Sequence, residues 1–146
     1  MSIIAVLHAG ERALARQRFA ELWTRVEGRD AFHECVLCHY MADAQDDPAE
    51  ELCWDRRALD AALVARSTDG AREEPSPFGV TLASFFPSLH LNLAADLHAL
   101  GDRALARAHL LEARRSLDGL ADADPDLARL TRQAIDRLAR RLDEGD

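Results

Sequence analysis

One segment of the sequence has residue types and a spacing that could carry chemistry directly, Cys35-Val36-Leu37-Cys38-His39. A Cys-x-x-Cys-His segment is the pattern to which haem is covalently attached, with the histidine as a ligand of the iron. That attachment requires export, and the apolar run from Ile3 to Leu7 is too short for the hydrophobic core of a signal peptide. Haem is therefore not expected.

A zinc or thiol redox site is a second possibility for the same residues. Cys35 and Cys38 would share one helix face, and zinc takes four thiolate or imidazole ligands. His39 would be a third ligand, and either Cys53 or His33 a fourth. The competing interpretation is that these small cysteines fill a tight interface between helices. The odd number of cysteines, three, favours free thiols in a reducing compartment. We predict helix packing and no cofactor, and keep the metal or redox module as an alternative.

The acidic residues between positions 43 and 55 could bind a divalent cation, but they lack the glycine-punctuated loop of a calcium site. Carboxylates are also favourable at the start of a helix, where the helix dipole is positive. We interpret them as capping and solvated groups: Asp43, Asp46, Asp47, Glu50, Glu51 and Asp55. The histidines are scattered, and the sequence has no Gly-x-Ser-x-Gly, phosphate-binding glycine loop or His-Glu-x-x-His motif. No enzymatic activity is predicted.

The composition favours packed helices. Alanine and leucine together make up about a third of the 146 residues, and aromatic residues only 5%. The net charge of −8 repels phosphate backbones, so nucleic acid is excluded as a partner. We find no apolar run of membrane-spanning length, and we therefore expect a cytoplasmic protein without a membrane partner.

Six helices are predicted from apolar residues that recur every three or four positions. The first three cover about residues 11–27, 30–45 and 47–66. The fourth runs from about 84–87 to 100, the fifth from 102 to at least 117, and the sixth from 124 to at least 142. The segment 67–83 contains Gly70, Pro75, Pro77 and Gly79 and is predicted to be an irregular loop. Short connections make neighbouring helices antiparallel, so we predict an all-α fold of helical hairpins in a single domain over 1–146.

The segment from Leu89 to Ala113 resembles a tetratricopeptide repeat (TPR). Asn92-Leu93-Ala94 is similar to the family's Asn-Leu-Gly, Gly101-Asp102 occupies its turn, and Ala106 its close contact between helices. The hairpin from Cys35 to Leu59 resembles the repeat more weakly, and the helix after Gly10 resembles the second half of a truncated one. Residues 38–59 and 85–102 are also similar to uncharacterised actinobacterial TPR-like proteins.

The resemblance implies a short right-handed array in which the first helix of each hairpin lines a concave groove. The side chains that would line this groove are His33, Tyr40, Asp43, Ser88, Asn92 and His98. We therefore expect a non-enzymatic module that binds a protein or peptide of unknown identity. The carboxylate-clamp class of the family is disfavoured, because its cationic residues are missing from this face and Asp43 has the wrong sign. A groove that is only solvated, or filled by the chain's own loop, is the alternative.

A structural role through self-association is a further alternative, and a homodimer is possible. Its anchors would be Trp23, Trp54 and the Phe85-Phe86 pair.

The last predicted helix has a basic side, which could dock an acidic partner or simply face solvent: Arg129, Arg132, Arg137, Arg140 and Arg141.

Overall fold

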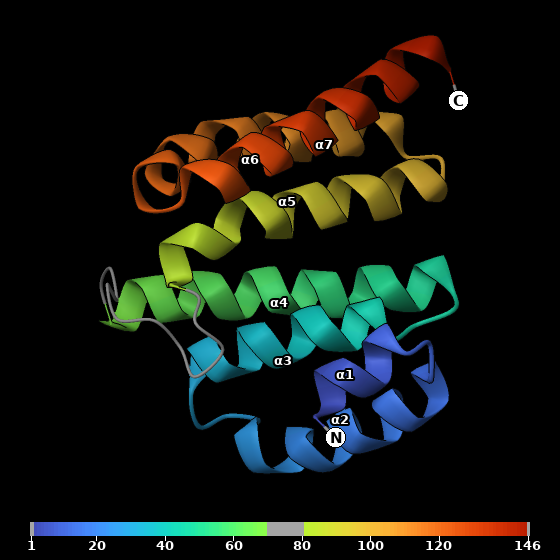
Figure 1. Ribbon diagram of the computed structural model, residues 1–146, viewed down its shortest axis with the longest axis vertical. Coiled ribbons are helices and arrows are strands. Elements are labelled where there is room, and N and C mark those ends of the chain that lie inside the picture. Colours follow the sequence, from blue (N-terminus) through green and yellow to red (C-terminus); the bar gives the residue numbers. More distant parts are fainter. Residues whose placement is uncertain (1, 70–80, 146) are drawn as a thin grey trace. The chain divides into compact units, whose positions relative to one another are not determined.

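The computed structural model describes residues 2–69 and 81–145, and within these ranges every regular element is an α-helix (Figure 1). The all-α prediction is confirmed. Backbone contacts divide the chain into two compact units, residues 1–70 and residues 71–146, called unit 1 and unit 2 below. Each unit is described by itself, and a single domain over 1–146 stays a prediction.

Unit 1 contains four helices: α1 (Ile3–His8), α2 (Arg12–Val26), α3 (Ala31–Asp43) and α4 (Pro48–Asp69). The six predicted helices omit α1, so the prediction of six is wrong: the described residues form seven. In the sequence, residues 3–7 of this helix are recognisable only as an apolar run. The segment forms a helix of six residues because the Ser2 hydroxyl accepts the Ala5 N–H at 3.1 Å.

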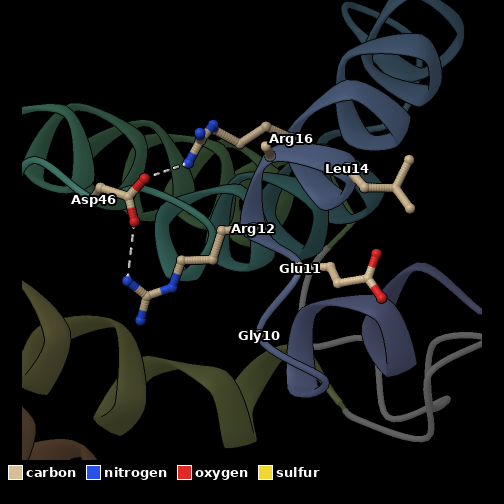
Figure 2. Close-up of a pocket in the computed structure, with 7 residues that line it drawn as sticks. Gly10, Glu11, Arg12, Leu14, Arg16 and Asp46 are labelled. Carbon is tan, nitrogen blue, oxygen red and sulfur yellow. Dashed lines mark hydrogen bonds and ion pairs between the residues drawn. The ribbon is translucent and has the colours of Figure 1, made fainter.

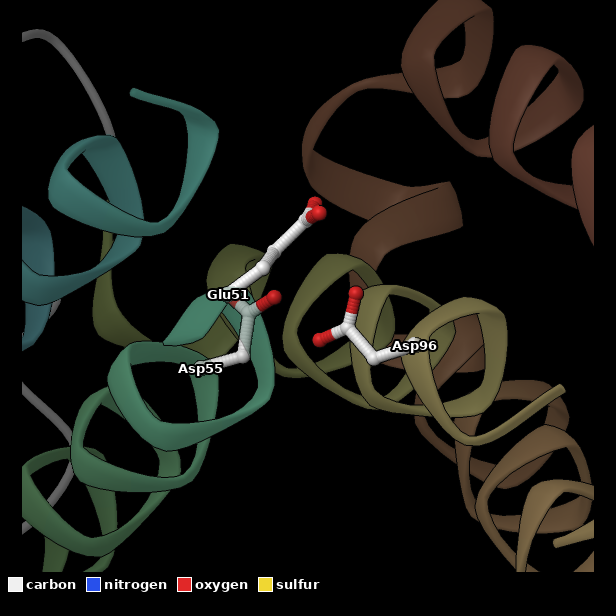
Figure 3. Close-up of side chains that lie close together, drawn as sticks. All are labelled: Glu51, Asp55 and Asp96. Atoms are coloured by element: carbon white, nitrogen blue, oxygen red, sulfur yellow. The ribbon is translucent and has the colours of Figure 1, made fainter. Parts of the chain in front are cut away.

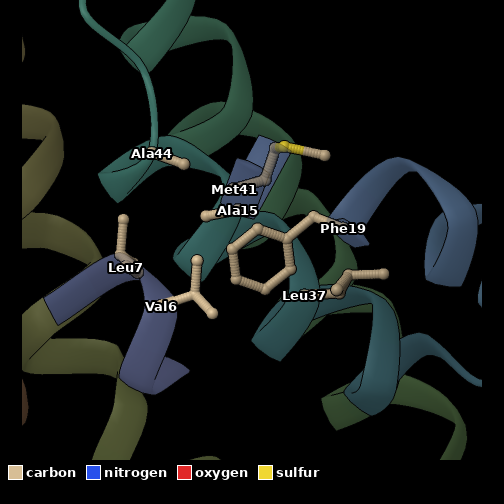
Figure 4. Packing of buried hydrophobic residues seen from close by; sticks show 7 residues of the cluster. All are labelled: Val6, Leu7, Ala15, Phe19, Leu37, Met41 and Ala44. Carbon is tan, nitrogen blue, oxygen red and sulfur yellow. The ribbon is translucent and has the colours of Figure 1, made fainter. Parts of the chain in front are cut away.

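One buried cluster of unit 1 lies where α1, α2 and α3 meet (Figure 4). Phe19 at its centre is 2% exposed. The buried residues that surround it come from all three helices and from the end of α3: Val6, Leu7, Ala15, Leu37, Met41 and Ala44. At the edge of this cluster the Trp23 and Trp54 rings meet edge to face, with centroids 5.5 Å apart. Arg57 lies over the Trp54 ring at 4.8 Å, a cation–π contact.

Helices α3 and α4 pack together as a hairpin in which small side chains allow close approach (Figure 1). Ala58, Ala62 and Ala65 of α4 are fully buried, as is Cys35 of α3. Helix α4 continues to Asp69. The predicted irregular loop, 67–83, therefore starts too early, because residues 67–69 still belong to the helix. Residues 70–80 lie outside the described residues.

Unit 2 contains α5 (Leu82–Ala99), α6 (Arg103–Ala123) and α7 (Pro125–Glu144). Helix α5 begins at Leu82, earlier than predicted, because Thr81 caps it by accepting the Ser84 N–H at 3.3 Å. Asp124 alone connects α6 to α7 and accepts the Leu127 N–H at 3.0 Å. The buried faces of the three helices supply the core of this unit: Leu89, Leu93, Ala94, Ala106, Leu110, Ala113, Ile135 and Leu142.

The same turn occurs once in each unit. Gly10 follows α1 and Gly101 follows α5, with φ of +83° and +87°, in the left-handed region that favours glycine. The next residue, Glu11 or Asp102, donates its N–H back to Val6 at 3.2 Å or Leu97 at 2.8 Å, which is the Schellman arrangement. Residues 10–16 read Gly-Glu-Arg-Ala-Leu-Ala-Arg, and residues 101–107 read Gly-Asp-Arg-Ala-Leu-Ala-Arg. The two turns are thus an internal repeat in sequence and in conformation.

Among the described residues, no helix combines the length and the apolar character that crossing a bilayer requires.

Candidate functional site

A surface pocket in unit 2 lies between α5 and α7. It has a volume of about 330 Å³ and is lined by Ala95, His98 and Ala99 of α5 and by Leu138 and Arg141 of α7. Three of its side chains are apolar and two carry nitrogen. Both ring nitrogens of His98 are buried without a hydrogen-bond partner in the described part of the chain. A buried polar group of this kind has a free-energy cost that a ligand can offset.

The outer stripe of α5 leads to this pocket. Ser88, Asn92, Ala95 and Ala99 follow one another at the spacing of a single helix face. The two polar residues are half-buried and the two alanines are exposed. His98 borders the stripe. The three groove residues predicted on this helix therefore lie on or beside one accessible face, which is lined with small side chains.

The three groove residues predicted on α3 have separate surroundings. His33 lies at the start of the helix, where its Nδ1 is 3.3 Å from the Asp30 carboxylate. Tyr40 packs on the Phe19 ring of α2, with centroids 6.4 Å apart and planes within 7°. Burial and the neighbouring Asp43 raise the pKa of Tyr40 above its ordinary value. His33 and Asp43 are ten residues apart, about 15 Å along a helix axis, so these residues do not form one pocket.

Asp43 lines a pocket of about 430 Å³ at the end of α3, together with His8, Arg12 and Gln45. A larger and shallower pocket of about 670 Å³ lies beside it, around the turn between α1 and α2 (Figure 2). Arg12 and Arg16 both reach across it to Asp46, with N–O distances of 3.1 and 2.9 Å. These two hydrogen bonds hold the pKa of Asp46 below its ordinary value.

Sequence reasoning missed this arginine pair. Its signal was the repeated Arg-Ala-Leu-Ala-Arg segment, which places two arginines one turn apart on one face. Arg16 also donates to the Ala44 carbonyl at 2.7 Å. Because both guanidinium groups are already bound to Asp46, the pair holds α2 against the end of α3 rather than offering a vacant anion site.

The positions of the three cysteines favour a role in packing between helices. Cys35 and Cys38 are buried and Cys53 is exposed. Burial raises the pKa of Cys38 to about 12 and that of Cys35 further, so both remain thiols. Burial also lowers the pKa of His39. Across residues 2–69 and 81–145, Cys35, Cys38, His39 and Cys53 do not bring three donor atoms together at metal-binding distance.

The acidic residues of α4 do not all face solvent. Asp47 accepts the Ala49 N–H at 3.1 Å, as expected of a residue at a helix start. Glu51 and Asp55 lie one turn apart on α4 (Figure 3), and Asp55 is only 1% exposed. The interpretation of these residues as capping and solvated groups is therefore wrong for Asp55. Its burial follows from a helical face that also buries Leu52 and Ala62.

Two histidines that lie far apart along the chain are in contact in unit 2. His90 of α5 and His109 of α6 lie with their Nδ1 atoms 3.1 Å apart, and both are half-buried. They are 19 residues apart in the chain, and the turn at Gly101 brings their helices together.

Comparison with known proteins finds no matching family model, no similar curated protein and no similar solved structure.

Proposed function

We propose that the chain is a non-enzymatic, TPR-like interaction module that binds a peptide segment of a partner protein along the outer stripe of α5. The proposal includes helical hairpins stacked in a right-handed array, a cytoplasmic location, and a peptide that places a carboxylate in the pocket of His98 and Arg141. The observation that carries it is the accessible stripe of Ser88, Asn92, Ala95 and Ala99 beside that pocket.

Small side chains support this choice of surface. Ala95 and Ala99 leave the backbone of α5 open to close approach, as the stripe of a binding helix requires. An amide such as that of Asn92 can both donate to and accept from a peptide backbone. A partner would therefore gain directional hydrogen bonds as well as contact area.

Charge supports an acidic peptide. Arg141 carries a permanent positive charge, and its exposed guanidinium can bind a carboxylate through two parallel hydrogen bonds. The apolar walls from Ala99 and Leu138 lower the local polarity and strengthen such a pair. The cation comes from α7, whose basic side the sequence offers as a possible docking surface for an acidic partner.

The test is a selection of random twelve-residue peptides displayed on phage against the immobilised full chain. Enriched peptides are then synthesised, and their binding is measured by fluorescence anisotropy. We expect enriched peptides that share at least one Asp or Glu. Ala95→Arg should abolish their binding, because the large side chain covers the stripe. Arg141→Ala should weaken binding by about 1.5–3 kcal/mol, the range for a hydrogen bond to a charged group.

Ala108→Arg is the matched control, because it makes the same substitution at an exposed alanine within α6. This variant should bind as the wild type does. The proposal is wrong if no peptide is enriched, or if Ala95→Arg and Ala108→Arg bind an enriched peptide equally well.

A further inference from the structure

We propose that His90 and His109 form a binding site for a late transition-metal cation, of the class of Cu²⁺, Ni²⁺ and Zn²⁺. The site lies within one hairpin, because His90 belongs to α5 and His109 to α6. It is separate from the peptide-binding stripe and does not depend on the function proposed above.

The spacing of the two nitrogens matches two ligands of one ion. The Nδ1 atoms are 3.1 Å apart, and the ring centroids are 5.4 Å apart. With metal–nitrogen bonds of about 2.05 Å, that separation subtends an angle of about 98° at the ion. Square-planar coordination requires about 90° and tetrahedral coordination about 109°, so the pair is within reach of both. Both rings would have to turn so that their Nδ1 lone pairs point at a common ion.

Without metal, the short contact is a hydrogen bond in which one Nδ1–H donates to the other Nδ1. An ion would replace that shared hydrogen. The donor ring would then carry its proton on Nε2, and both Nδ1 lone pairs would bind the ion. Each neutral ring keeps one proton throughout, so proton number balances at neutral pH.

The surroundings of His90 and His109 favour metal binding. The Phe86 ring lies 6.5 Å from the His90 ring, centroid to centroid, and forms an apolar wall that limits where the imidazole can turn. In the described ranges no third His, Cys, Asp or Glu lies close enough to share the ion. Water or another ligand would complete the coordination. Two imidazoles select Cu²⁺, Ni²⁺ and Zn²⁺ over Mg²⁺ and Ca²⁺, which take oxygen ligands.

An ion bound to both residues would join α5 to α6. Because it binds the folded hairpin and not the separated helices, it raises the stability of that hairpin, and above its Kd the gain grows with the logarithm of the ion concentration. The site would make the stability of unit 2 responsive to metal.

The test uses the full chain carrying Cys53→Ser, since this substitution removes the exposed thiol as a competing ligand. Cu²⁺, Ni²⁺, Zn²⁺ and Mg²⁺ are titrated separately by calorimetry in a non-coordinating buffer, and thermal unfolding is followed by circular dichroism. We expect one Cu²⁺ per chain, tightest binding for Cu²⁺, no binding of Mg²⁺, and a higher Tm with metal. His90→Gln and His109→Gln should each weaken Cu²⁺ binding by at least about 10–100-fold, the loss seen even for outer partners of metal ligands.

His98→Gln is the matched control, because it removes another half-buried histidine of α5. Its affinity for Cu²⁺ should equal that of the parent. Electron paramagnetic resonance of the Cu²⁺-loaded parent gives a readout that does not depend on the variants folding, and it should show two nitrogen ligands. A spectrum with one or no nitrogen ligand, or unchanged affinity in His90→Gln and His109→Gln, would overturn the proposal.

Discussion

Arg16 donates a hydrogen bond to the carbonyl oxygen of Ala44 at 2.7 Å, at the residue that directly follows α3 and caps its C-terminus. In unit 2, Arg107 donates in the same way to the Leu142 carbonyl at 3.1 Å, in the last turn of α7. The last carbonyls of a helix have no partner within it, so each arginine satisfies an otherwise open acceptor. Each also lies near a carboxylate, Asp46 at 2.9 Å or Asp143 at 3.6 Å.

Replacing Arg16 should therefore cost more than replacing its neighbour in the same ion-pair network. We expect Arg16→Ala to lower the free energy of unfolding by about 1–2 kcal/mol, because it leaves the Ala44 carbonyl without its charged donor. The ion pair of Arg12 is with the exposed Asp46, so Arg12→Ala should have little measurable effect. Urea titrations followed by circular dichroism compare the two variants. Equal losses would contradict a specific role for the carbonyl contact.

Replacing the turn glycine should lower the stability because of its backbone conformation alone. Gly101 has φ of +87°, and apart from its neighbours in the chain no residue lies within 4 Å of where a Cβ would be. We expect Gly101→Ala to lower the stability by about 1–2 kcal/mol, the cost of the left-handed conformation. Gly119, within α6, is equally open but helical, and Gly119→Ala should raise stability by about 0.5–1 kcal/mol. Opposite signs for the two substitutions would establish that conformation is the cause.

The two turns differ at one residue, and the difference should be measurable. Asp102 caps α6 by accepting the Leu105 N–H at 3.1 Å, whereas Glu11 makes no side-chain cap for α2. We expect Glu11→Asp to supply the missing cap and raise stability by about 0.5–1 kcal/mol. The reciprocal Asp102→Glu should lower it by a similar amount. A gain from Asp102→Glu would refute the assignment.

The thiols should react in two classes. We expect Ellman's reagent to modify Cys53 quickly at pH 8, while Cys35 and Cys38 react only in denaturant. Burial excludes the reagent from both, and it raises the pKa of Cys38 to about 12, so almost no thiolate is present. Cys53→Ser should abolish the fast phase and leave the slow one. Rapid modification of two or more thiols in the native protein would contradict this.

Stability should fall at mildly acidic pH because of His39. Burial lowers the pKa of this residue in the folded state, although the nearby Asp43 acts in the opposite direction. The unfolded chain takes up the proton near pH 6.5, and the folded chain only at lower pH, so protons favour unfolding in that window. The full contribution of neutral His39 is present above pH 6.5 and is lost as the pH falls. His39→Gln should lose less stability than the wild type between pH 7.5 and about 5.5.

Most of the helices could be predicted because their ends carry strong local signals. Gly101-Asp102 and Asp124-Pro125 mark helix boundaries with a positive-φ glycine, a capping carboxylate and a proline at the first helical position. Helix α1 was missed because its six residues are too few to show a period, although Ser2 and Gly10 mark its two ends.

The site was less predictable, since a side chain's environment depends on its neighbours in space. Tyr40 was assigned to a groove, but its ring packs on Phe19, and a helical pattern does not distinguish these positions. His90 and His109 meet through the side-by-side packing of α5 and α6, and the distance that results cannot be obtained from spacing along the chain. The burial of Asp55 could not be predicted from the sequence for the same reason.

The edge-to-face contact of Trp23 and Trp54 has a practical consequence, since these are the chain's two tryptophans and both belong to unit 1. Their fluorescence reports the melting of that unit selectively, while far-ultraviolet dichroism records the helices of both. Comparing the two signals in one denaturation experiment reveals whether the halves of the molecule unfold together or in sequence.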